Sequence, residues 1–128
     1  MVLEEKNNEP SSVSEKEYHA SLTKLKQYML QEKPFLNPSL TIQDVSVAIE
    51  IPVRDLSLLI NHKLEQHFYD FVNTYRIENA MDILKDVTKS KVTVLEILYE
   101  VGFNSKSSFN TAFKKYTGNT PTSYRKQL

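Results

Sequence analysis

The chain has 128 residues, 40% of them hydrophobic and 25% charged, with no cysteine and a formal net charge of zero. This length suffices for a folded domain with its own core, and the composition excludes collagen-like, low-complexity and disulfide-rich classes. No apolar run approaches the roughly 18 residues of a membrane span and residues 1–16 lack the pattern of a signal peptide, so we expect a cytoplasmic protein without membrane contact through these residues.

The N-terminal quarter predicts a polar tail and one amphipathic helix. Residues 1–13 are polar, and we expect them to be disordered. Ser14 and Glu17 have the spacing of a capping box, which predicts a helix over residues 14–33. The apolar stripe of this helix comprises Tyr18, Leu22, Leu25 and Met29. Two uses of the stripe stay open: a coiled-coil homodimer through residues 14–31, or packing against the chain's own domain.

An internal repeat follows a connector that contains two prolines. Residues 41–51 and 93–103 align with an offset of 52, and each copy has a threonine, an acid three positions later and matching apolar residues. With one residue inserted, residues 56–60 match residues 109–113. Each copy predicts a short capped helix, a turn and a second helix, which is the helix-turn-helix arrangement.

Glycine positions and a long apolar stripe complete the expected architecture. Gly102 and Gly118 stand at the predicted ends of the two helices of the second copy, and Thr120 with Pro121 predicts a closing helix. Between the copies, residues 69–86 predict a linker helix about 27 Å long. The expected fold is all-α, with two homeodomain-like helix-turn-helix subdomains joined by this linker helix and with an extra N-terminal amphipathic helix.

Charge is distributed unevenly, although its total is zero. Residues 1–33 carry a net charge of −1, residues 34–88 of −4 and residues 89–128 of +5. The predicted subdomains are residues 34–86, which include the linker helix, and residues 87–128. The second subdomain is therefore basic, and a surface of this kind attracts a polyanion.

The second copy carries the landmarks of a known family. Residues 97–125 read ILYEVGFNSKSSFNTAFKKYTGNTPTSYR, with Gly-Phe after an apolar helix, aromatic residues four apart, a lysine pair, Gly, Thr-Pro and Tyr-Arg. This stretch resembles the second helix-turn-helix of AraC/XylS-type transcription regulators. Residues 40–60, LTIQDVSVAIEIPVRDLSLLI, resemble the first. The resemblance extends over residues 40–127.

The resemblance implies a transcription regulator that binds double-stranded DNA sequence-specifically, with its two second helices in successive major-groove segments. These segments recur about every 34 Å, a distance that the linker helix and its flanking units can span. Domains of this type usually end a longer regulator. We therefore expect a fragment linked through residues 14–33 to a missing sensor, which is either soluble or membrane-bound and is a second candidate for dimerisation.

Residues for DNA contact follow from helical spacing together with the resemblance. In the second copy Phe109, Phe113 and Tyr116 share one helix face, which we expect in the core. The opposite face presents the base-readout candidates Lys106, Ser107, Asn110 and Thr111. Amide, hydroxyl and ammonium groups can bond base edges in the major groove. At the end of the helix, Lys114 and Lys115 are expected to contact phosphate.

The first copy departs from the family pattern. Glu50 and Glu65 stand where the second copy has its glycines, and Leu58 stands where similar proteins have a long polar side chain. The base-readout candidates in this copy are Arg54, Ser57 and Leu58, and the phosphate candidates are Asn61 and Lys63.

The remaining polar residues indicate no catalytic or metal site. We expect Arg76 to form a structural ion pair, with Glu96 as candidate partner, and Arg125 to pair with a carboxylate or a phosphate. The histidines lack the spacing of metal ligands, and no phosphate-binding loop or nucleophile motif is present. We therefore predict a protein that is not an enzyme and has no cofactor or small-molecule site. The alternative function is a helical protein–protein interaction module without DNA affinity.

Overall fold

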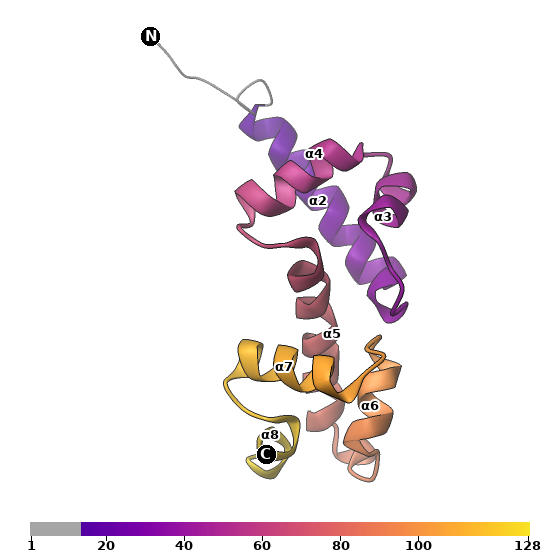
Figure 1. Ribbon diagram of the computed structural model, residues 1–128, viewed down its shortest axis with the longest axis vertical. Helices are drawn as coiled ribbons and strands as arrows, with labels where there is room; N and C mark the ends of the chain where they lie inside the picture. The colour runs from indigo at the N-terminus through magenta and orange to yellow at the C-terminus, as the bar shows by residue number, and fades with distance from the viewer. Residues whose placement is uncertain (1–13) are drawn as a thin grey trace. The chain divides into compact units, whose positions relative to one another are not determined.

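The computed structural model describes residues 14–128, which form helices and turns without a strand. The α-helices of these residues are α2 (Glu15–Glu32), α3 (Ile42–Ile49), α4 (Val53–Leu58), α5 (Phe68–Lys85), α6 (Val94–Glu100), α7 (Lys106–Thr117) and α8 (Pro121–Lys126) (Figure 1). Shorter elements are the 3-10 helices η2 (Pro34–Leu36) and η4 (Val87–Lys89) and the π-helical η3 (Leu59–Lys63). The expected all-α fold is confirmed. The tail expected over residues 1–13 lies outside the described residues.

The chain divides into two compact units, each of which contains one helix-turn-helix. Among residues 14–128, unit 1 comprises residues 14–33 and Thr41–Phe68, and unit 2 comprises Pro34–Leu40 and Tyr69–Leu128. Almost all of the linker helix α5 therefore belongs to unit 2. The functional subdomains expected from the sequence, residues 34–86 and 87–128, stay a prediction.

Unit 1 is built from α2, α3, α4 and η3. The capping boxes of α2 and α3 both form, with the hydroxyls of Ser14 and Thr41 accepting bonds from backbone N–H groups. α2 contacts α3 and η3, and its Leu25 and Met29 are completely buried. This part of the apolar stripe therefore packs inside its own unit. A homodimer through α2 stays a prediction, and it would have to use the other face of the helix.

The second helix of the first repeat is not one uniform α-helix, although the repeat predicts a single helix after the turn. α4 continues directly into the π-helical η3, where the N–H of Leu64 donates to the carbonyl of Leu59 over 3.2 Å. Leu59 and Ile60 are both buried, whereas the three residues that follow them are exposed. Burial of two adjacent apolar residues together with the wider π turn explains the difference from the expected helix.

The core of unit 2 joins the C-terminal half of α5 to α6 and α7. Its buried members are Ile77, Ala80, Ile83, Leu84, Ile97, Leu98, Val101, Phe103, Phe109 and Phe113. Phe109 lies between two rings, with centroid distances of 5.3 Å to Phe103 and 5.6 Å to Phe113. Phe113 in turn meets Tyr124 of α8 edge to face at 5.4 Å. The expected core role of Phe109 and Phe113 is confirmed.

Arg76 has a structural role, but the expected ion pair with Glu96 is wrong. Its guanidinium is buried and donates to the carbonyls of Phe35, at 2.7 Å, and Asn37, at 2.9 Å. A third bond of 2.9 Å runs to the side-chain oxygen of Asn73. Burial lowers the pKa of Arg76. The carboxylate of Glu96 accepts bonds from Thr93 instead, at the N-terminus of α6.

Left-handed backbone marks equivalent positions of both repeats. Gly102 has φ 111° and Gly118 has φ 81°, which confirms both as helix stops. The matching residues of unit 1, Glu50 and Glu65, adopt φ 58° and φ 54° although they carry side chains. A residue with a Cβ in this region costs about 1–2 kcal/mol. The first copy therefore keeps the local geometry of the second at some cost in stability.

Gly102→Ala should destabilise the protein by at least about 3 kcal/mol, because left-handed strain adds to the disruption of a buried hydrogen bond. A Cβ at this position would lie 2.2 Å from the carbonyl oxygen of Phe35 and 2.8 Å from Nε of Arg76. Gly118→Ala is the control, since a Cβ there meets nothing within 4 Å and only the strain remains. Urea unfolding followed by circular dichroism measures both. Equal losses would show that the close approach at Gly102 is no constraint.

Candidate nucleic-acid interface

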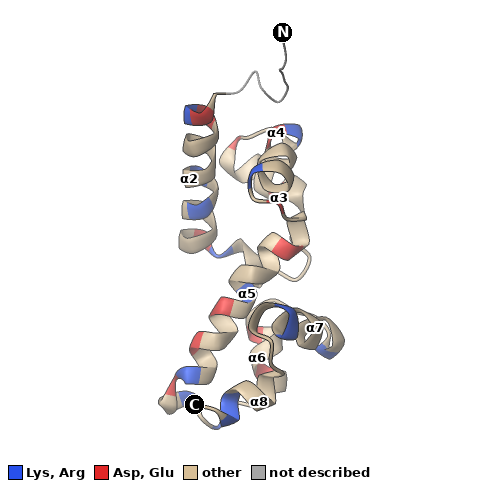
Figure 2. Ribbon diagram, turned by 90° about the vertical axis from the view of Figure 1, so that its left-hand side faces the viewer, with Lys and Arg blue, Asp and Glu red and all other residues tan. Residues whose placement is uncertain are grey.

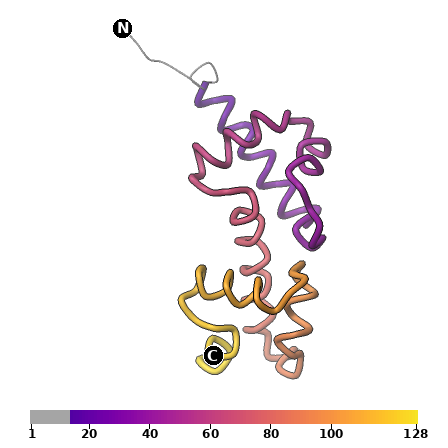
Figure 3. Tube along the Cα trace, viewed as in Figure 1, coloured from indigo at the N-terminus to yellow at the C-terminus, as the bar shows by residue number. Residues whose placement is uncertain are grey.

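The helix-turn-helix of unit 2 directs one face of α7 to solvent. Thr93 caps α6 and Ser105 caps α7, and the turn between the two helices can be followed in Figure 3. Phe109 and Phe113 anchor the inner face of α7 in the core. The outer face consists of exposed residues, namely Lys106, Ser107, Asn110, Thr111, Lys114 and Lys115. The structure thus brings together all six candidates of the second copy.

A shallow groove runs along this outer face. It is lined by Lys106, Asn110, Thr111, Lys114 and Lys115 of α7, by Val94, Leu95 and Leu98 of α6, and by Thr120, Pro121 and Thr122 at the start of α8. The side chains suited to hydrogen bonding therefore line a concave surface whose other walls come from the neighbouring helices. Ser107 is exposed but does not line the groove.

The lysines of α7 differ in their ion pairing. Nζ of Lys115 lies 3.4 Å from the carboxylate of Asp70 on α5, and its side chain is 71% exposed. Within residues 14–128, Lys106 and Lys114 form no ion pair. Figure 2 shows blue segments on α7 and α8 and red segments along α5. Of the three lysines of α7, only Lys115 is thus ion-paired within the described part of the chain.

Two bonds that the sequence does not reveal fix the ends of this helix-turn-helix. Tyr116, expected in the core, is instead 46% exposed, and its hydroxyl donates to the carboxylate of Glu78 over 2.6 Å. This bond, with desolvation as a smaller cause, raises the pKa of Tyr116 to about 12. Arg125 donates to the carbonyls of Val92 and Lys89 and forms no ion pair with a carboxylate of residues 14–128, while a contact with phosphate stays a prediction. Both bonds join residues more than 30 positions apart, and no local pattern signals them.

The candidates of unit 1 are less uniformly exposed. Arg54 and Asn61 are exposed, whereas Ser57 and Leu58 are half-buried. Leu58 lines a pocket between α2 and α4, together with Tyr18 and Pro52. The side chain of Leu58 is therefore partly engaged inside its own unit.

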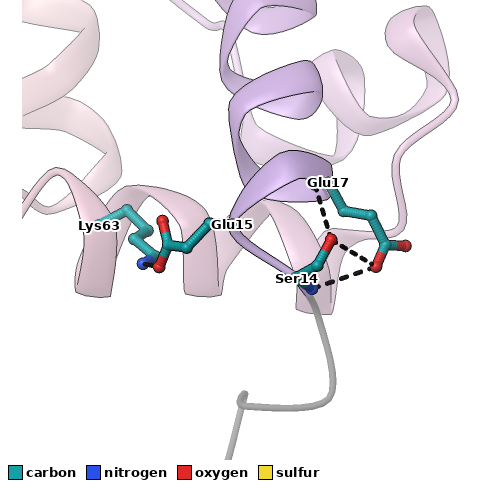
Figure 4. Close-up of polar contacts among 4 residues, drawn as sticks. All are labelled: Ser14, Glu15, Glu17 and Lys63. Atoms are coloured by element: carbon teal, nitrogen blue, oxygen red, sulfur yellow. Dashed lines mark hydrogen bonds and ion pairs between the residues drawn. The ribbon is translucent and has the colours of Figure 1, made fainter.

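Lys63 is held by α2. Its ammonium bonds the carboxylate of Glu15 at 2.5 Å and lies 4.7 Å from the centre of the Tyr18 ring. Figure 4 shows the side chains of Lys63 and Glu15 converging, while Glu17 turns to Ser14 in the capping box. Sequence reasoning missed this contact, because the two partners are 48 positions apart and no pattern relates them.

Among residues 14–128, no three histidine or acidic side chains are gathered so that they could hold a metal ion. No helix in this part of the chain combines the length and the apolar character needed to cross a membrane.

The amino-acid sequence is similar to helix-turn-helix proteins. A family model described as a helix-turn-helix domain matches residues 36–127. The melibiose operon regulatory protein of Escherichia coli is 30% identical over 88 residues, 69% of this chain and 28% of that protein. An uncharacterised HTH-type transcriptional regulator of Staphylococcus aureus is 34% identical over 86 residues, 67% of this chain and 11% of that protein.

Solved structures share the fold. The C-terminal domain of AraT, a response regulator from Geobacillus stearothermophilus, is similar with a TM-score of 0.69 and 28% identity, and 84% of each chain is covered. A transcriptional regulator of AraC type from Chromobacterium violaceum has a TM-score of 0.68 at 20% identity, with 85% of this chain and 95% of that chain covered, and shows likeness of fold.

These findings first define a class, that of all-α proteins with paired helix-turn-helix units. Within that class, the chain belongs to the AraC-type helix-turn-helix family. It spans 28% of the length of the melibiose regulator and 11% of that of the staphylococcal regulator.

The Tyr116–Glu78 bond should be visible in a tyrosine titration. The pKa of Tyr116 is raised from 10.0 to about 12, so the folded state favours the protonated phenol. The stability that this bond contributes is present below pH 10 and is lost as the pH rises through about 12. Ultraviolet difference titration of wild type against Tyr116→Phe should isolate this phenol, and Glu78→Gln should lower its pKa toward 10. A phenol that already titrates near 10 in wild type would contradict the bond.

Proposed function

We propose that this chain is the DNA-binding part of a transcription regulator and that its recognition helices, α7 and α4 with η3, enter the major groove of duplex DNA. The observation that carries the proposal is the outer face of α7, where amide, hydroxyl and ammonium groups line one groove. These are the donors and acceptors that major-groove base edges bond. Family membership and the regulatory relatives support the same function.

The roles in unit 2 divide by chemistry. Asn110 can form two bonds to adenine, Lys106 can reach the acceptors of guanine, and Thr111 and Ser107 offer hydroxyls, with Ser107 at the margin. Lys114 and Lys115 lie in the last turn of α7 and are assigned to phosphate, which sets register without reading sequence.

Unit 1 is proposed to contribute fewer base contacts. Arg54 is its best-placed reader, because it is exposed in the first turn of α4. Ser57 and the partly engaged Leu58 are assigned lesser base contacts. Asn61 and Lys63 are assigned to phosphate. With α5 about 27 Å long, the two recognition helices are proposed to occupy successive major-groove segments, which recur about every 34 Å.

Asn110→Ala tests base readout. The variant should lose about 1–3 kcal/mol on a duplex selected from random DNA and should relax one base position, while its affinity for unselected duplex stays unchanged. Anisotropy titrations on both duplexes measure the difference. Equal losses on both would refute the assignment of Asn110 to a base. Stoichiometric binding to a protein partner without duplex affinity at low salt would favour the interaction-module alternative.

Lys114→Ala and Lys115→Ala form a matched pair for phosphate contact. Lys114→Ala should weaken binding to every duplex and reduce the slope of log affinity against log salt by about one. Lys115→Ala should have a smaller effect, because Lys115 must leave Asp70 before it meets phosphate. The same titrations repeated over a salt series provide both slopes. A loss confined to one DNA sequence would assign Lys114 to base readout instead.

A further inference from the structure

The contact between Lys63 and α2 bears on how unit 1 would hold DNA. The ammonium of Lys63 bonds Glu15 at 2.5 Å and lies over the ring of Tyr18, so a carboxylate and an aromatic face both attract its charge. The Lys63 side chain retains 36% of its exposure, against 71% for Lys115. Among the lysines assigned to DNA, Lys63 is therefore the most strongly engaged within residues 14–128.

The place of Glu15 in α2 favours its charged form. It lies in the first turn of α2, where the helix dipole favours a carboxylate. Glu17, in the same turn, is occupied by the capping box with Ser14, and Figure 4 shows its carboxylate turned away from Lys63. Of the two carboxylates in this turn, Glu17 therefore caps the helix and Glu15 pairs with Lys63.

We propose that Glu15 is an intramolecular competitor for DNA phosphate at Lys63, so that α2 limits the backbone contact of unit 1. A phosphate that approaches Lys63 either displaces Glu15 or lies beside a charge of its own sign, and both reduce the gain from binding. This inference rests on the proposed function and adds a determinant of affinity that lies outside the recognition helices.

The test compares Glu15→Gln with Glu32→Gln, which removes the same charge at the other end of α2, where Glu32 forms no ion pair within residues 14–128. The full chain is titrated at low salt with a mixed-sequence duplex of about 30 base pairs, roughly three helical turns. Glu15→Gln should bind about two- to fivefold more tightly than Glu32→Gln, the range that corresponds to an exposed ion pair.

The same substitutions in a Lys63→Ala background complete the cycle. Removal of Lys63 should abolish the difference in duplex affinity between Glu15→Gln and Glu32→Gln, because Glu15 then has no lysine for which to compete with phosphate. The proposal is overturned if the two glutamine variants bind equally, if the advantage persists without Lys63, or if Glu15→Gln binds more weakly than wild type. Urea unfolding of each variant checks that a difference in affinity is not a difference in folding. If no variant, wild type included, binds duplex at the lowest salt, the proposed function fails and this inference fails with it.

Discussion

The guanidinium of Arg76 is the contact around which unit 2 is organised. It reaches from α5 to the carbonyls of Phe35 and Asn37, and it lies 5.5 Å from the ring centre of Phe103. A buried arginine needs acceptors for its N–H groups, and carbonyl oxygens satisfy them here. Because Phe103 directly follows Gly102, the guanidinium of Arg76 lies next to the turn of the helix-turn-helix. Only a glycine at position 102 leaves room for it.

The direction of α7 follows from that turn. Phe103 leads into a row of rings formed with Phe109 and Phe113, and Tyr124 of α8 closes the row. Once these rings occupy the core, helical periodicity leaves the polar residues of α7 on the opposite side. The exposed face that carries the proposed DNA contacts is thus a consequence of apolar packing.

Local signals in the sequence predicted most of this fold. Capping boxes, the two glycines and aromatic residues four apart each act within one helical turn, so they can be read from residues that are neighbours in the chain. The backbone acceptors of Arg76, the partner of Tyr116 and the contact between Glu15 and Lys63 join residues 38 to 48 positions apart, and no such signal exists for them. The π-helical η3 was missed for a related reason, since it depends on which side chains the finished core admits.

The two repeats share a backbone plan but differ in what they offer to a ligand. Unit 1 reproduces the left-handed helix ends of unit 2 with Glu50 and Glu65. It therefore keeps this backbone geometry without the glycines that adopt it with little strain. It also engages Leu58 and Lys63 against α2, whereas Lys106 and Lys114 of unit 2 form no ion pair within the described part of the chain. On the proposed function, the two units therefore share a fold but present different surfaces to DNA. On that function, unit 2 supplies most of the base contacts, and unit 1 adds the reader Arg54 and a backbone contact at Lys63, where Glu15 of α2 is the proposed competitor.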